Sequence, residues 1–215
     1  MTEDPHPGGV SSAPEHNWAA AAAVLLPILR PVGTSGIDLE SLDPERLAIE
    51  GMKSHARPVV DEGPGGLAIA YALRASAFDI LVNADHILAW GATPAEVRAA
   101  AMANLAAWSA SAPWTDEVAG RRRLLASASG DGGDAVRVLL PEVRAHLHAE
   151  LGSDGRILVA VPERDLLLAG CLTTDDEEFG ALFAAFVRDH ADGTDQPIDQ
   201  RVFELVDGEL VPFVP

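Results

Sequence analysis

The sequence predicts an α+β fold, in which a mostly antiparallel or mixed sheet is covered by helices and ends in a C-terminal β-hairpin. Short apolar runs occur in neighbouring pairs, and a short polar step joins the two members of each pair. Segments with helix-capping signals lie between these pairs. Paired strands separated by helices favour this class over a doubly wound parallel sheet, in which single strands and helices alternate.

The clearest strand pair lies between residues 155 and 170. Two apolar runs, Ile157–Val161 and Leu166–Ala169, flank the polar step Pro162-Glu163-Arg164-Asp165. Proline presets the backbone for a turn, and an aspartate side chain can hydrogen-bond to nearby backbone. We therefore expect a tight antiparallel pair in the middle of the sheet, with a charged step at one end.

The N-terminal region is predicted to hold a loose arm followed by a helix. Residues 1–15 are rich in proline, glycine and serine, so we expect them to be disordered. A single α+β domain is expected over residues 16–215, because one core suits a chain of this length. A helix is expected from Asn17 to Leu26, and Pro27 kinks or ends it.

The next segments predict a second strand pair and a capped helix. Residues 43–45 open a short helix in this interpretation, and His55–Val60 form a strand. Leu67–Leu73 and Phe78–Val82 are apolar runs joined by a short step, as in an antiparallel pair. Thr93-Pro94-Ala95-Glu96 is a capping box that begins a helix, which ends near Pro113.

Two further helical segments follow a strand at Leu124–Ser127. Asp134–Leu151 has a helical pattern, with Pro141 as either a kink or the first turn of a second helix. Thr174 to Glu177 form a second capping box, and the helix that follows ends at Asp192-Gly193.

The chain ends in a predicted hairpin. Val202–Val206 and Glu209–Phe213 flank Asp207-Gly208, a dipeptide that favours two-residue hairpin turns. Pro212 cannot donate a ladder hydrogen bond, so the last strand is expected at an edge of the sheet.

The chain is acidic, since 15 Lys and Arg residues against 33 Asp and Glu residues give a formal charge of −18. Such a charge repels phosphate backbones, so nucleic acid is not an expected partner, whereas a basic protein would be attracted. The single cysteine, Cys171, excludes an internal disulfide and a multi-cysteine zinc site, and we expect a reducing, cytoplasmic setting. The longest apolar run, Ala19–Leu29, is too short to span a membrane, and no signal peptide or cofactor is predicted.

Three segments of the chain follow a recognisable order. Residues 67–105 have the pattern of strand, turn and strand, then Trp90-Gly91 and a capped helix that ends in Asn104-Leu105. Residues 159–168, VAVPERDLLL, come next, and a short acidic segment with a helix follows. Together these resemble the YtpQ-like family of uncharacterised bacterial proteins, whose own step is Val-Pro-Asn-Arg-Asp-Leu. The resemblance covers roughly residues 67–190 and implies the order of the segments, since the family has no established activity. Glu163 stands where that family has asparagine, and the acidic residue expected near Leu73-Arg74 is missing.

The polar step Glu163, Arg164 and Asp165 is the first candidate site. A carboxylate–guanidinium set on a strand-end turn binds polar ligands or takes part in acid–base chemistry. The alternative is an ordinary turn, in which Asp165 bonds to backbone and Arg164 pairs with a surface carboxylate.

Asp85 and His86 are the second candidate site. His86 beside a carboxylate is suited to act as a general base or metal ligand, and the alternative is that the pair are ordinary turn and helix-cap residues.

The remaining candidates are an amide and a basic cluster. Asn104 lies near the apolar stripe of its helix, where it bonds a neighbouring backbone segment or points into a ligand cleft. Arg121, Arg122 and Arg123 receive an anionic ligand or acidic partner, or they pair with the protein's own acids. His146 and His148 are two residues apart on a predicted helix and face different sides, so no metal site is predicted there.

These observations lead to three hypotheses of function. The first is a non-catalytic module with an acidic surface that binds another macromolecule, such as a basic protein, because no familiar catalytic motif is present. The second is an enzyme or small-ligand binder with Glu163–Asp165 and Asp85–His86 around the sheet edge. The third is self-association through the alanine-rich first helix or the C-terminal hairpin.

Overall fold

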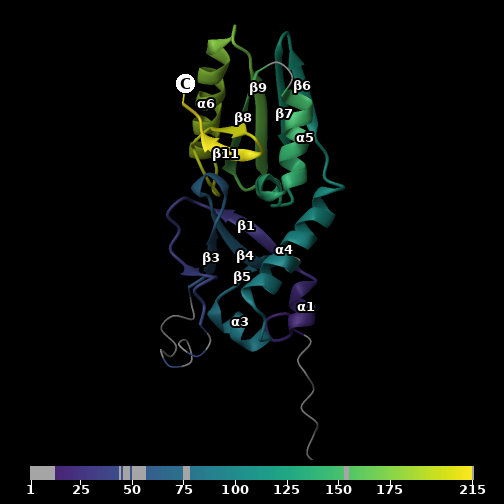
Figure 1. Cartoon of the computed structure of the whole chain (residues 1–215), viewed down its shortest axis with the longest axis vertical. Helices are drawn as coiled ribbons and strands as arrows, with labels where there is room; N and C mark the ends of the chain where they lie inside the picture. Colours follow the sequence, from purple (N-terminus) through teal and green to yellow (C-terminus); the bar gives the residue numbers. More distant parts are fainter. Residues whose placement is uncertain are drawn as a thin grey trace, which may run out of the picture.

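The structure, a computed structural model, describes residues 13–43, 45, 49, 57–74, 78–152 and 155–214. Two sheets lie one beyond the other along the longest axis of the molecule, and helices cover them (Figure 1). The α+β class with mostly antiparallel strands is therefore confirmed. Residues 1–12 of the expected arm, most of the short helix expected from residue 43, and the start of the expected strand at His55 lie outside the described residues.

The N-terminal sheet is built around one long strand, which pairs on both sides. Its strands lie in the order β1-β4-β3-β2, and the fifth strand, β5, pairs with β4. All of these pairings are antiparallel except that of β2 with β3. The strands are β1 (Leu25–Arg30), β2 (Ile37–Asp38), β3 (Val59–Glu62), β4 (Ala68–Arg74) and β5 (Asp79–Leu81).

The C-terminal sheet has six strands in the order β11-β10-β8-β9-β7-β6, and all neighbours are antiparallel. The predicted central pair and the predicted C-terminal hairpin are both confirmed, and β11 lies at an edge. The strands are β6 (Thr115–Ala119), β7 (Arg122–Ser127), β8 (Arg156–Glu163), β9 (Leu166–Leu172), β10 (Phe203–Val206) and β11 (Glu209–Pro212).

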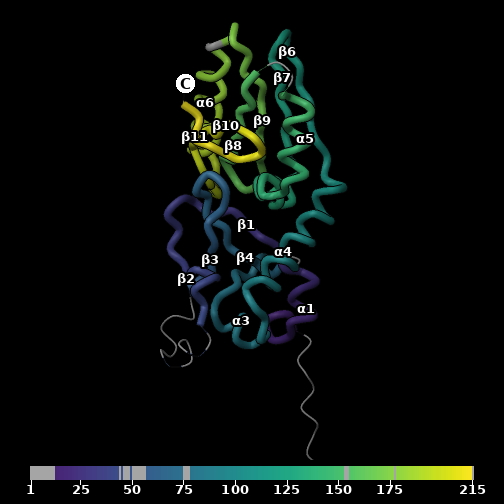
Figure 2. The backbone as a smooth tube through the Cα atoms, viewed as in Figure 1, coloured from purple at the N-terminus to yellow at the C-terminus, as the bar shows by residue number. Residues whose placement is uncertain are grey.

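Five described helices and two 3₁₀ turns surround these sheets. Helix α4 starts beside the N-terminal sheet and leads to the C-terminal one, as the backbone trace shows (Figure 2). No helix in the described part of the chain is long and apolar enough to cross a membrane. The helices are α1 (Trp18–Ala22), α3 (Ala84–Trp90), α4 (Pro94–Ser109), α5 (Pro141–Leu151) and α6 (Glu177–Gly193), and the 3₁₀ turns are η2 (Pro64–Gly66) and η3 (Ala135–Leu139).

Strand β8 is apolar from Ile157 to Pro162 because both of its faces are covered. Ile157 and Val159 belong to the apolar cluster that contains α5 and η3, whereas Leu158 and Ala160 pack in the cluster that contains α6. Alternate residues of a strand point to opposite faces, so a strand between two helical layers loses the apolar–polar alternation. The uninterrupted apolar run in the sequence thus reflects a two-sided core.

The two sheets share one apolar cluster. Leu29 and Leu67 of the N-terminal half pack in the same cluster as Phe203 and Leu139 of the C-terminal half. Gly65, in the 3₁₀ turn η2, has a φ of 65°, and a Cβ there would lie 2.5 Å from the Phe203 ring. Only glycine therefore allows η2 to lie this close to β10.

The prediction of a helix from Asn17 to Leu26 is wrong for the second half of that segment. Asn17 caps α1, but α1 ends at Ala22, and Leu25–Arg30 form β1. Pro27 lies inside this strand, which is tolerated because β1 is at the edge of its sheet and need not donate on both sides. Burial of Leu25 and Leu29 outweighs the helix propensity of the preceding alanines.

The structure also decides where α6 and α5 begin, and it contains one strand that the sequence did not predict. Asp176, not Thr174, caps α6, because its carboxylate accepts the backbone N–H of Phe179. Pro141 begins a second helix after η3, which is the second of the two alternatives. Strand β6 was not expected, because every residue of it is exposed and it carries no apolar pattern.

Candidate functional site

The corner between β8 and β9 opens onto a cavity of about 490 Å³. The segment that follows α6 lies along this corner, because Ile198 N donates to Pro162 O at 2.9 Å and Arg164 N donates to Gln196 O at 3.4 Å. We call this cavity the acidic pocket. It is lined by Glu163, Arg164, Asp165, Asp189, His190, Gly193, Thr194, Asp195 and Gln196.

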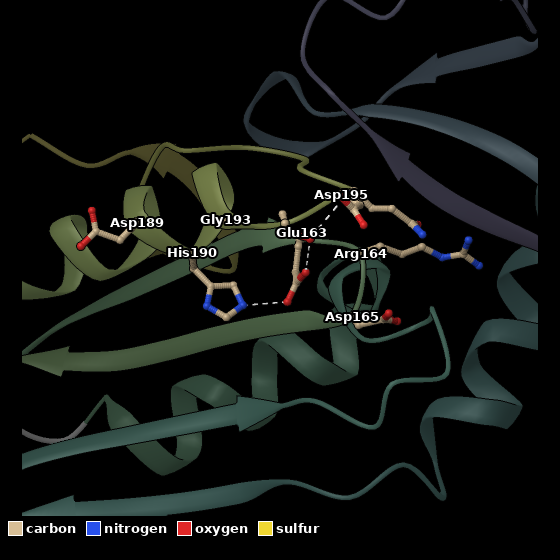
Figure 3. Close-up of a pocket in the computed structure, with 9 residues that line it drawn as sticks. Glu163, Arg164, Asp165, Asp189, His190, Gly193 and Asp195 are labelled. Carbon is tan, nitrogen blue, oxygen red and sulfur yellow. Dashed lines mark hydrogen bonds and ion pairs between the residues drawn. The ribbon is translucent and has the colours of Figure 1, made fainter.

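Glu163 is held by two side chains from α6 and the segment after it. His190 Nε2 lies 2.7 Å from Glu163 Oε1, and Thr194 Oγ1 donates to Glu163 Oε2 at 2.5 Å (Figure 3). Burial alone would raise the pKa of Glu163, but the hydrogen bonds from Thr194 and His190 outweigh it and lower the pKa below its ordinary value. Glu163 is therefore a carboxylate over the neutral pH range.

Arg164 turns away from the pocket and ties the two sheets together. Its guanidinium pairs with Asp79 of β5, and its Nε donates to Gly132 O at 3.1 Å. In Figure 3 the side chain extends in the direction opposite to His190. The turn alternative expected a surface carboxylate as its partner, but the Asp79 side chain is only 15% exposed.

The remaining carboxylates leave the pocket with negative charge. Asp195 and Asp189 are exposed, and neither side chain makes a hydrogen bond or ion pair within the described part of the chain. Asp189 stands at the rim, where its side chain points away from Glu163 (Figure 3). The backbone bond expected for Asp165 is absent at Oδ1, which is buried without a hydrogen-bond partner among the described residues. The pocket thus offers acceptors and no free cation.

A second cavity of about 260 Å³ adjoins the acidic pocket, and we call it the adjoining cavity. It lies between the end of β1 and the segment 195–198, and it shares Arg164, Asp195 and Gln196 with the pocket. Its other walls are Ile28, Leu29, Arg30, Pro31, Pro197 and Ile198.

No protein-family model, curated protein or solved structure matches this chain. The resemblance to the YtpQ-like family stays a prediction, which rests on residues 67–105 and 159–168.

Asp85 and His86 do not join the corner. They lie in the first turn of α3, and neither lines the acidic pocket. His86 Nδ1 accepts the backbone N–H of Asn83 at 3.1 Å, while Asn83 accepts the N–H of His86, so the pair forms a capping box. Burial lowers the pKa of His86, and its ring stacks on Trp90. The structure thus favours the helix-cap alternative for this pair.

Asn104 bonds a neighbouring backbone segment, the first of its two alternatives. Its Nδ2 donates to Ala22 O and to Leu25 O, both at 2.8 Å. The amide therefore fixes the junction between α1 and β1.

The arginine cluster pairs with the protein's own acids, as the second of its alternatives predicted. Each guanidinium contacts a carboxylate from a distant part of the chain, so none of the three is left as a free cation. Arg121 pairs with Asp175, Arg122 with Asp176 and Glu178, and Arg123 with Asp116 and Glu150.

The residues that sequence reasoning missed are His190, Thr194, Asp189 and Asp195, which complete the acidic pocket. The end of α6 at Asp192-Gly193 was recognised, but nothing local indicates that the chain returns to Glu163 there. Among the described residues, no group of three or more His, Cys, Asp or Glu side chains is arranged to hold a metal ion.

Proposed function

We propose that this protein is a non-catalytic module that binds a basic segment of another protein, whose positively charged side chain enters the acidic pocket. The observation that carries the proposal is the charge of the pocket. Glu163 and Asp195 present carboxylates there, whereas Arg164 is already paired with Asp79. An arginine or lysine side chain would form charge-assisted hydrogen bonds with these carboxylates.

The charge of the whole chain supports the same partner. A formal charge of −18 attracts basic segments over long distances and raises their association rate. Because the pocket is open to solvent and its pairs are partly exposed, each contact is worth little alone. Binding is therefore expected to be fast, weak and sensitive to salt.

Peptide binding tests the proposal. A short fluorescein-labelled peptide of alternating arginine and glycine is titrated with the full chain, and fluorescence anisotropy reports binding. A peptide of alternating glutamate and glycine serves as the negative probe. Asp195→Asn is expected to weaken arginine-peptide binding up to about fivefold, as for removal of one partly exposed ion pair.

The matched control removes the same charge elsewhere. Asp207 lies in the turn between β10 and β11, is exposed, and has no side-chain partner among the described residues. Asp207→Asn should leave the affinity unchanged. Equal weakening by both variants would mean that the acidic surface as a whole, and not the pocket, attracts the peptide.

One observation favours a small-ligand site or enzyme as a second candidate. The pair of Glu163 and His190 lies inside a cavity at 2.7 Å, a distance at which a proton can pass between them. In this second candidate function, His190 is the histidine beside Glu163, a role that the sequence predicted for His86. Calorimetry with free arginine and with spermidine separates the two candidates. A small-ligand site should bind one of these two compounds as tightly as it binds the arginine peptide, whereas a peptide-binding site should bind both compounds more weakly.

A further inference from the structure

We propose that the partner segment is the C-terminal end of a peptide chain, and that Arg30 in the adjoining cavity binds its free carboxylate. A basic residue just before the end then lies in the acidic pocket. This inference rests on the proposed function and adds which part of a basic chain is recognised.

Arg30 is an unpaired cation at the wall of a cavity. It is the last residue of β1 and is partly buried, and its side chain makes no hydrogen bond or ion pair with any described residue. Asp195 lines the same cavity and is also unpaired, so two opposite charges share this space without contacting each other. A ligand with one cationic and one anionic group satisfies both, because each charge gains a partner of opposite sign.

Arg164 supplies a second donor to the same space. Its Nε and Nη2 are used by Gly132 and Asp79, but its Nη1 has no hydrogen-bond partner within the described part of the chain. A carboxylate has two oxygens, which match two separate guanidinium donors. Arg30 and Arg164 therefore form a small anion site next to a pocket that selects cations.

The charge of the surroundings decides which anion fits. Glu163 and Asp195 lie in the adjacent pocket, and the whole chain is strongly negative. A phosphate group, with up to two negative charges, would be repelled by these acids, whereas a carboxylate carries a single charge. A monoanion tethered to a cation is thus favoured over a phosphorylated ligand.

The apolar part of the adjoining cavity fits the side chain of the last residue. Ile28, Pro31 and Ile198 line it together with the two arginines. Burial of an aliphatic side chain there adds affinity that a free amino group or a charged last residue would not supply. The recognised end therefore consists of a basic residue followed closely by an apolar residue with a free carboxylate.

Two peptides that differ only at their ends test the inference. Fluorescein-labelled Gly-Ser-Lys-Arg-Gly-Leu is made with a free C-terminal carboxylate and as the C-terminal amide, and anisotropy gives the affinity of the full chain for each. The wild-type protein is expected to bind the acid roughly tenfold more tightly than the amide, as for one charge-assisted contact. Arg30→Gln should lose most of this preference, because only the Arg164 donor then remains, and Arg30→Glu should prefer the amide.

The matched control is Arg188→Gln, which removes an arginine from the exposed side of α6 outside both cavities. It should keep the preference for the acid. Thermal melting confirms that each variant is folded, which is expected because Arg30 has no partner to lose.

The outcomes separate the inference from the proposed function. Equal binding of acid and amide by the wild-type protein, or an unchanged preference in Arg30→Gln, overturns this inference. Neither outcome contradicts the proposed binding of a basic side chain in the acidic pocket. Binding of neither peptide overturns both. Free arginine bound as tightly as the acid peptide overturns the assignment to a peptide end.

Discussion

Replacement of Asp134 by alanine is expected to destabilise the protein by about 3 kcal/mol, because it leaves a buried arginine without a compensating charge. Asp134 is buried at the start of η3. Its carboxylate accepts hydrogen bonds from Ser127 Oγ at 2.5 Å, from Ser129 N at 2.9 Å and from Ser129 Oγ at 2.8 Å. Ser127 Oγ in turn accepts from Arg137 Nη1 at 2.6 Å, so the hydroxyl links the two charges.

The magnitude follows from the burial of Arg137, which is only 2% exposed. Burial lowers the pKa of this guanidinium, and Asp134 acts in the opposite direction. Removal of one partner of a buried pair costs about 3–5 kcal/mol, and the lower end applies because Ser127 separates the two charges. For a chain of this length, about 3 kcal/mol corresponds to a decrease in Tm of roughly 6–12 °C.

Urea unfolding followed by tryptophan fluorescence measures the change. Asp131→Asn is the control, because Asp131 lies in the same loop and is exposed, and its change should stay within about 0.5 kcal/mol. Arg137→Met added to Asp134→Ala should restore part of the stability, since the uncompensated charge is then gone. A loss below about 1 kcal/mol, or a double variant no more stable than Asp134→Ala, would refute the reasoning.

Three further changes test other contacts. Gly132→Ala should lower the free energy of unfolding by roughly 1–3 kcal/mol in urea, because φ is 72° and a Cβ would lie 2.5 Å from Arg164 Nη2. Asn104→Ala should lower the free energy of unfolding by about 1–3 kcal/mol in urea, since two partly buried backbone carbonyls lose their donor. Asp61→Asn should lower Tm at pH 7 but not near pH 2, as measured by circular dichroism. Burial raises the pKa of Asp61, but the hydrogen bonds from Arg98 and Tyr71 and the charge of Arg98 together outweigh burial and lower the pKa. The stabilisation is therefore present above the ordinary value of 3.8 and lost as the pH falls through the lower folded pKa. An equal Tm difference at both pH values would show that the Asp61 charge is not responsible.

The sequence predicts those parts of the fold in which local pattern and burial agree. The pair Ile157–Val161 and Leu166–Ala169 was predictable because α5 and α6 cover both faces, which makes both strands continuously apolar. Strand β6 was not predictable from the sequence, because all of Thr115–Ala119 is exposed and only its pairing with β7 makes it a strand. The first two residues of β1, Leu25 and Leu26, were mistaken for the end of a helix, because the alanine-rich segment before them has high helix propensity and the pairing of β1 with β4 is not local.

The residues of the candidate site likewise fall into those that the sequence predicted and those that it misplaced. Glu163, Arg164 and Asp165 were predictable as a charged corner, because a polar step between two apolar runs has few other interpretations. Asp85 and His86 were placed beside it by residue type alone, and the structure instead uses His86 to cap α3. Residue type indicates which chemistry a side chain can do, but it carries no information about which distant segment meets it.

The return of His190 to Glu163 follows from the lengths of two elements. Strand β9 has 7 residues and leads away from the corner for about 23 Å, at roughly 3.3 Å per residue. Helix α6 has 17 residues and packs back along β8 and β9 for about 26 Å, at roughly 1.5 Å per residue. Because the two lengths nearly match, the last turn of α6 and the residues after it must lie at the corner where β9 began. Loss of one turn from α6 would place His190 and Asp195 short of Glu163, so the charge of the acidic pocket depends on the length of this helix as much as on its side chains.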